Sequence, residues 1–177
     1  ILRGQVDGKP SKDERIIQSV KRGLSPYEDF EGYLALAHNP DMRIIISNTT
    51  EAGIVYTGKD SFDDKPQASY PGKLTRLLYE RFTALGGKKG TGFILLPCEL
   101  IDYNGRNLEE CCMKTAEQWG LSEEFKTWLK TENVFCSTLV DRIVTGYPRG
   151  EAESLYEEFG YRDNMLDTAE PFGLWVI

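Results

Sequence analysis

Apolar, β-branched runs alternate with helical segments along this sequence. Three of the runs, at residues 42–54, 93–105 and 135–148, end in polar residues. Between and after them, apolar residues recur at the three- and four-residue spacing of a helix face at 69–85, 107–120, 122–132 and 151–161. This alternation predicts an α/β fold, with a mostly parallel sheet and flanking helices.

Shorter segments add to this outline. Residues 15–20 read as a short strand, and both ends of the chain, "ILRG" and "FGLWVI", are strand-like. A helix is expected from about residue 25, with Ser25 as its cap and Pro26 at its first position.

Two adjacent charges interrupt the third run, "FCSTLVDRIVTGYP", which we interpret as one buried strand. Neighbouring side chains of a strand point to opposite faces, so Asp141 and Arg142 are not expected to pair with each other. An unpaired charge in a core would cost about 3–5 kcal/mol. We therefore expect residues 140–142 at the carboxyl end of a strand. Asp141 would line a crevice, and Arg142 would turn away to bond backbone carbonyls or an acid.

Polar residues follow three of the predicted strands, at 47–51, 97–105 and 140–142. Ligands of open α/β sheets bind in the crevice at the carboxyl ends of strands. These segments are therefore a candidate site, although Asn, Asp, Thr and Ser also cap ordinary turns.

Charge and composition exclude some classes of function. The net charge of −7 argues against a nucleic-acid binder, and no apolar run approaches the roughly 20 residues of a membrane span. The four cysteines lack the paired spacing of a zinc site and lie in apolar stretches. We expect reduced thiols in a cytoplasmic protein without a metal. The single histidine, His38, precedes an Asn-Pro turn and is not expected to be catalytic.

The segments "SNTTEAGI", "PCELIDYNG" and "FCSTLVDRIVTGYPR" together resemble the mannitol dehydrogenase family of long-chain, zinc-independent polyol dehydrogenases. "LAHNPDMR", "SYPGKLTRLLYERF" and "LDTAEPF" are similar to the family too, in particular to members that act on hexuronates. The resemblance implies a Rossmann-type fold and NAD-linked interconversion of D-tagaturonate and D-altronate. NADP is not excluded by the sequence.

The resemblance also implies parts that residues 1–177 do not contain. These are the glycine-rich strand and turn that hold the pyrophosphate, and the C-terminal helical domain with the catalytic lysine. We therefore expect one partial Rossmann-type domain over 1–177, inactive by itself and with weak or no NADH binding. The partner would be a small hexuronate, with no nucleic acid and no membrane. The sequence does not indicate an oligomeric state.

The resemblance assigns roles residue by residue. Asp141 is the expected catalytic group. Expected substrate contacts are Glu51 and Asn104, and expected cofactor contacts are Asn48, Thr49, Thr50 and Val140. Glu99 and Arg142 are expected to position the residues that contact the reacting groups, although Glu99 could instead accept a hydrogen bond at the start of a helix. Leu100 stands where polyol-oxidising relatives carry an asparagine, whose role Asn104 is a candidate to replace, although Asn104-Gly105 is also a turn signal.

Two other readings remain open. A Rossmann-like binding module without chemistry would need no glycine-rich turn. A cysteine-dependent hydrolase or reductase would use Cys98 or Cys136, but it needs a base near the thiol.

Overall fold

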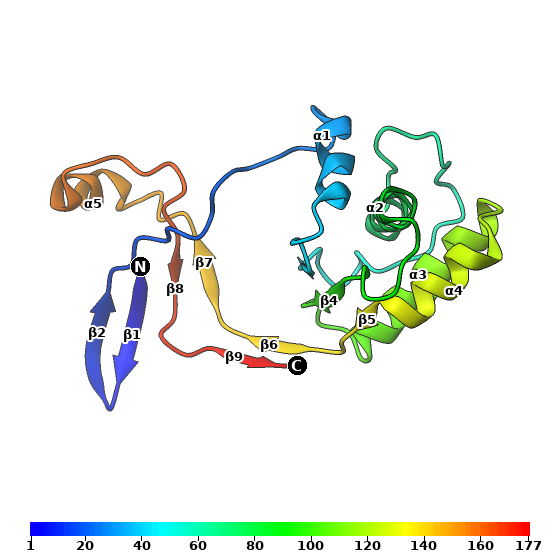
Figure 1. The fold of residues 1–177 in the computed structure, drawn as a ribbon. Coiled ribbons are helices and arrows are strands. Elements are labelled where there is room, and N and C mark those ends of the chain that lie inside the picture. The colour runs from blue at the N-terminus through cyan, green and yellow to red at the C-terminus, as the bar shows by residue number, and fades with distance from the viewer. The chain divides into compact units, whose positions relative to one another are not determined.

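The computed structural model describes all residues 1–177, which divide into two compact units (Figure 1). One unit contains residues 1–21 and 140–175, and the other contains residues 22–139 and 176–177. We describe them separately. The assignment of all 177 residues to one domain stays a prediction.

The unit of residues 22–139 is built on a parallel three-stranded sheet. Its strands are β3 (Ile44–Ser47), β4 (Ile94–Pro97) and β5 (Val134–Phe135), in that order. Helix α2 (Tyr70–Leu85) connects β3 to β4, and helices α3 (Asn104–Gln118) and α4 (Glu123–Glu132) connect β4 to β5. A short helix α1 (Phe30–Ala35) and a 3-10 turn, η1 (Leu36–His38), precede β3. The prediction of an α/β fold with parallel strands and flanking helices is confirmed.

Local sequence explains where α2 begins and ends. The Ser69 hydroxyl caps it by accepting a hydrogen bond from the Gly72 amide, and Pro71 lies in its first turn. Gly86 ends it in the left-handed conformation, at φ 67°. The apolar face that the periodicity predicted, with Leu74 and Leu78, is buried.

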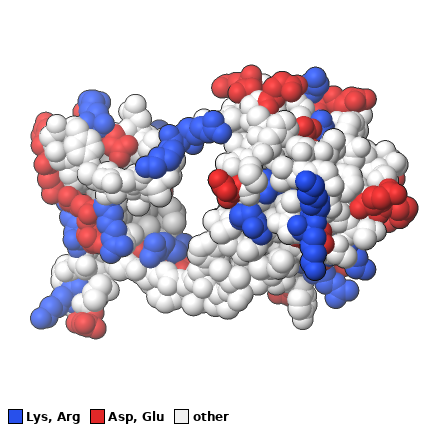
Figure 2. All heavy atoms as spheres, viewed as in Figure 1, with Lys and Arg blue, Asp and Glu red and all other residues white.

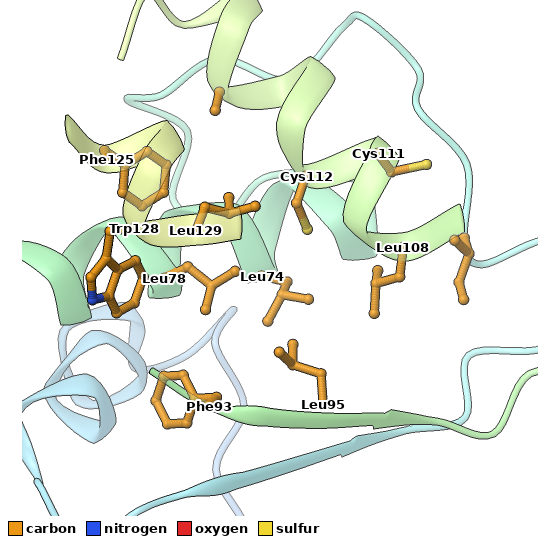
Figure 3. Packing of buried hydrophobic residues seen from close by; sticks show 12 residues of the cluster. Leu74, Leu78, Phe93, Leu95, Leu108, Cys111, Cys112, Phe125, Trp128 and Leu129 are labelled. Atoms are coloured by element: carbon orange, nitrogen blue, oxygen red, sulfur yellow. The ribbon is translucent and has the colours of Figure 1, made fainter. Parts of the chain in front are cut away.

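The hydrophobic core lies between this sheet and its helices (Figure 3). Phe93 and Leu95 on the β4 side face leucines of α2 and α3 and the aromatic residues of α4 in that view. The opposite face of the sheet is open, since Ile44, Ile46 and Val134 are 53–57% exposed.

The other unit has a mixed four-stranded sheet in the order β2-β1-β8-β7. Its strands are β1 (Leu2–Val6), β2 (Lys9–Asp13), β7 (Val144–Gly146) and β8 (Thr168–Ala169). β1 and β2 form an antiparallel hairpin whose turn, Asp7-Gly8, has positive φ at both residues. Asp-Gly is a strong sequence signal for such a turn, but the hairpin was not predicted. Helix α5 (Ala152–Phe159) packs with Leu166 in a small core. The remaining strands, β6 (Leu139–Asp141) and β9 (Leu174–Val176), form a two-stranded sheet.

Three predictions about local structure are wrong. Residues 135–148 are not one buried strand, because the chain there passes through the separate strands β5, β6 and β7 and is largely exposed. Residues 15–20 form no strand, since they have no neighbouring strand with which to pair. The first helix begins at Phe30, where Asp29 rather than Ser25 caps it by accepting from the Gly32 amide.

Acidic and basic side chains are interspersed on the face shown in Figure 2, with no continuous basic stripe there. None of the helices is long and apolar enough to cross a membrane.

Candidate functional site

The carboxyl ends of β3 and β4 are joined side by side. Ser47 and Pro97, the last residues of the two strands, are register partners, and the Cys98 amide donates to the Ser47 carbonyl at 2.7 Å. Two of the three polar segments that the sequence singled out, 47–51 and 97–105, therefore lie next to each other. This is the edge of a parallel sheet at which ligands bind.

Glu99 connects these two strand ends through a buried carboxylate, and its residue is only 1% exposed. One carboxylate oxygen accepts from the Thr49 amide at 2.9 Å and from the Thr49 hydroxyl at 2.8 Å. The other accepts from the Ser47 hydroxyl at 3.1 Å. Glu99 therefore holds the end of β3 in place, and its predicted role in supporting the reacting groups stays a prediction.

The segment after β3 turns sharply. Thr50 has φ 71°, in the left-handed region that β-branched residues seldom adopt, and the Gly53 amide donates to the Thr50 carbonyl at 3.1 Å. A Cβ at Gly53 would lie 1.8 Å from the Thr49 hydroxyl oxygen, so only glycine fits there. Asn48, Thr50 and Glu51 are exposed. On this turn, the side chains predicted to contact the cofactor (Asn48 and Thr50) and the substrate (Glu51) are therefore accessible to solvent.

Asn104 lies inside the same edge and is 1% exposed. Its amide nitrogen donates to the carbonyls of Pro97, Glu99 and Thr138 at 2.9–3.0 Å. Its amide oxygen accepts from the backbone amides of Gly105 and Thr138. Both amide hydrogens are thus engaged, and the contacts give Asn104 the role of joining three segments.

The substrate contact predicted for Asn104 remains a prediction, as does its replacement of the asparagine absent at Leu100, which is 59% exposed. The Asn104-Gly105 pair opens helix α3 and does not form an isolated turn. A Cβ at Gly105 would lie 2.3 Å from the Cys136 carbonyl oxygen, so glycine allows α3 to approach the segment after β5.

Val140, Asp141 and Arg142 belong to the other unit and lie at the end of β6, as predicted. Contrary to the buried strand expected from the sequence, Asp141 and Arg142 are exposed. The Arg142 guanidinium donates to the Phe172 carbonyl at 2.8 Å and to the Pro171 carbonyl at 3.4 Å. Arg142 therefore bonds backbone carbonyls, as expected of it.

A further contact in this unit was not anticipated from the sequence. The Glu170 carboxylate accepts from the Ile143 amide at 2.6 Å, and the Glu170 amide donates to the Ile143 carbonyl at 3.0 Å. No local sequence pattern pairs these residues, because they are far apart along the chain.

The cysteine-dependent alternative rests on Cys98 or Cys136 with a base near the thiol. Cys98 is buried, and its thiol lies 3.6 Å from the Leu96 carbonyl and 3.9 Å from the Thr138 hydroxyl. The His38 ring nitrogen contacts the Glu80 carboxylate at 2.8 Å, not a cysteine. Burial raises the pKa of the Cys112 thiol to about 12 and also raises the pKa of Cys111. No group of three or more His, Cys, Asp or Glu side chains is arranged to hold a metal ion.

Comparisons with known proteins agree with this fold. The family described as mannitol dehydrogenase Rossmann domain matches residues 5–177. Among solved structures, Pseudomonas fluorescens mannitol 2-dehydrogenase, in a ternary complex with NAD and D-mannitol, has a TM-score of 0.69 at 19% identity over 86% of this chain and 32% of its own. A D-sorbitol dehydrogenase in substrate-free form has a TM-score of 0.68 at 21% identity, over 84% of this chain and 32% of its own. These two likenesses show the fold.

Sequence relatives are closer in identity. The altronate oxidoreductase of Enterobacter sp. (strain 638) is 55% identical over 178 residues. Those of Escherichia coli O7:K1 (strain IAI39 / ExPEC) and Shigella flexneri are each 56% identical. All three alignments cover 100% of this chain and 37% of the relative, so the chain spans little more than a third of these proteins. With the family match over residues 5–177, the predicted family is confirmed: this chain belongs to the mannitol dehydrogenase family, to its Rossmann domain.

Proposed function

We propose that this chain is part of an NAD-dependent oxidoreductase that interconverts D-tagaturonate and D-altronate. The observation that carries the proposal is 55–56% identity to altronate oxidoreductases along the whole chain. Because the chain spans 37% of those relatives, the proposal concerns the full-length protein that contains this sequence.

The polar turn after β3 suits part of a nicotinamide cofactor. Asn48 and Thr50 are exposed and offer an amide and a hydroxyl, groups that can hydrogen-bond ribose hydroxyls or a carboxamide. The Thr49 hydroxyl gives its hydrogen to Glu99, which leaves its lone pairs free to accept. These residues would contact the cofactor, and a cofactor contact is proposed for Val140 as well. NAD, when bound, supplies the hydride donor or acceptor.

The substrate needs groups that bind hydroxyls and move a proton. Reduction of a ketone places a hydride on carbon and a proton on oxygen. Glu51 is an exposed carboxylate that would accept hydrogen bonds from substrate hydroxyls. Asp141 would orient the proton-transferring group. The base itself, in this proposal, is a lysine outside residues 1–177, and Arg142 would fix the end of β6 behind Asp141.

Turnover by the full-length protein tests the proposal. NADH absorbance should fall when D-tagaturonate is added, and NADH should form when NAD and D-altronate are mixed. D-fructose serves as a control because it is a ketone without the carboxylate, and we expect much slower turnover with it. NADH binding without turnover of either sugar acid would instead support the non-catalytic binding module.

Asp141 can be tested in the same assay. Asp141→Asn should lower turnover by roughly 10²-fold, the scale of a positioned proton-handling group. The melting temperature should change little, because the carboxylate is exposed. Turnover that survives Asp141→Asn, together with a lower melting temperature, would make Asp141 a structural residue only.

A further inference from the structure

The turn at residues 49–53 stores backbone strain, and the structure shows what maintains it. A threonine at φ 71° places its Cβ against its own backbone. The left-handed conformation is disfavoured for such a residue by a factor of roughly 5 to 30 in population. Thr50 is itself exposed, so packing around its side chain does not compensate for this cost.

The contacts that offset the strain at Thr50 are made by the preceding residue, Thr49. Thr49 is held by both its amide and its hydroxyl on one oxygen of the buried Glu99 carboxylate. Its side chain also occupies the space next to Gly53 that a Cβ would need. If Thr49 moved away, the buried Glu99 oxygen would lose both of its hydrogen bonds, at a free-energy cost. This cost keeps Thr49 in place and so holds the backbone of Thr50 in its strained conformation. Strained residues of this kind cluster at ligand-binding sites.

We propose that Glu99 is a positioning residue that holds Thr50 in its left-handed conformation, so that Asn48, Thr50 and Glu51 are already arranged to bind ligand. The inference rests on the proposed function, because it takes this turn as part of the cofactor site. Glu99 acts here as a hydrogen-bond acceptor, and its charge is not required.

The size of the effect follows from the strain. If Thr49 is released, the turn relaxes, and the binding-competent conformation falls to a fraction of roughly 1/5 to 1/30. The apparent Kd rises by the inverse of that fraction. Glu99→Met keeps the length of the side chain but has no acceptor, so in the full-length protein it should raise the Kd for NADH by roughly 5- to 30-fold.

Glu99→Gln separates geometry from charge. The glutamine oxygen can accept from both Thr49 groups, while its amide nitrogen donates to the Ser47 hydroxyl. We therefore expect Glu99→Gln to bind NADH within about threefold of the wild type. A rise in Kd as large as that of Glu99→Met would show that the charge matters, and would overturn the proposal. Glu117→Met on the exposed side of α3 is the matched control and should leave the Kd unchanged.

Thr50→Gly tests whether Glu99 acts through the strained residue. Glycine adopts positive φ without strain. In the Thr50→Gly background, Glu99→Met should therefore raise the Kd for NADH much less than it does in the wild type. Comparing the two ratios cancels any direct contribution of the Thr50 side chain to NADH binding. Equal ratios would mean that Glu99 does not act through Thr50.

A stability measurement on the same four proteins separates this inference from the proposed function. Where Glu99 maintains the strain at Thr50, the substitution Thr50→Gly relieves that strain. Thr50→Gly should therefore raise the melting temperature more, or lower it less, in the wild type than in the Glu99→Met variant. This holds even if the wild type binds no NADH, an outcome that would refute the function alone. If Glu99→Met does not fold, Thr49→Val removes one of the donors, and its effect on the Kd, compared with and without Thr50→Gly, should show the same pattern on a smaller scale.

Discussion

Replacing Arg81 should destabilise the unit of residues 22–139 by far more than replacing an exposed arginine. Arg81 lies on α2 and is 0% exposed, and no acidic side chain faces it. Its guanidinium instead donates to five backbone carbonyls, and it stacks over the ring of Phe93 at 4.5 Å from the ring centroid. The carbonyls belong to Ala37, Asn39, Pro40, Met42 and Thr91.

The magnitude follows from which carbonyls water can reach. Asn39 and Pro40 are exposed, so their carbonyls can be solvated after the arginine is removed. Ala37 is buried, and Met42 and Thr91 are half-buried. Each buried acceptor left without a partner costs about 1–3 kcal/mol. Removing the buried charge returns several kcal/mol of its desolvation cost. For Arg81→Met, which keeps similar volume, we expect a net loss of about 2–4 kcal/mol in the free energy of unfolding.

Thermal and denaturant unfolding of the protein measure this loss. It corresponds to a fall in melting temperature of about 4–16 °C for a chain of this size. Arg106→Met is the matched control, since Arg106 is exposed on α3 and pairs only with Glu110 at 3.2 Å. Such a pair contributes about 0.3–0.5 kcal/mol. If both variants melt at the same temperature, the carbonyl contacts of Arg81 do not stabilise the fold and this reasoning is refuted.

Three further substitutions or reagents test other parts of the same unit. Burial tends to raise the pKa of Asp60, but hydrogen bonds from Ser69 and Ala68 outweigh it and lower the pKa below 3.8. The stability that Asp60 contributes is therefore complete above pH 3.8 and is lost as the pH falls through the lower, folded-state value, so acid unfolding of Asp60→Asn should depend less on pH below about 4. Cys112, with its pKa raised to about 12 by burial, should resist iodoacetamide at neutral pH until the protein unfolds, and rapid labelling of the native protein would contradict the buried position. Gly105→Ala should lower the melting temperature because its Cβ would meet a backbone carbonyl at 2.3 Å, whereas the same change at Gly150, which has open space around it, should not.

Local patterns in the sequence were enough to predict most helices and strands in the unit of residues 22–139. The apolar spacing in 69–85 identified α2 almost to the residue, and the structure then showed its serine cap and closing glycine. The alternation of apolar runs with helices identified β3, β4 and the parallel sheet, because each run has its own polar end and needs no distant partner to be recognised.

Other segments with the composition of a strand were predicted poorly. Residues 15–20 and 135–148 have β-branched residues in plenty, but a strand exists only where another strand pairs with it. The buried strand expected around Asp141 failed for the same reason, since burial depends on what covers a segment.

For the candidate site, the sequence likewise predicted one part and the tertiary structure decided the other. The residue types at 47–51 and 97–105 were enough to locate it, because the carboxyl ends of parallel strands meet at one edge. What only the tertiary structure decided is how each residue is used. Asn104 bonds both the segment 97–99 and Thr138, and Glu99 reaches across 50 residues of sequence to hold Thr49. Such contacts depend on distances and directions in three dimensions, which a sequence pattern of short range does not encode.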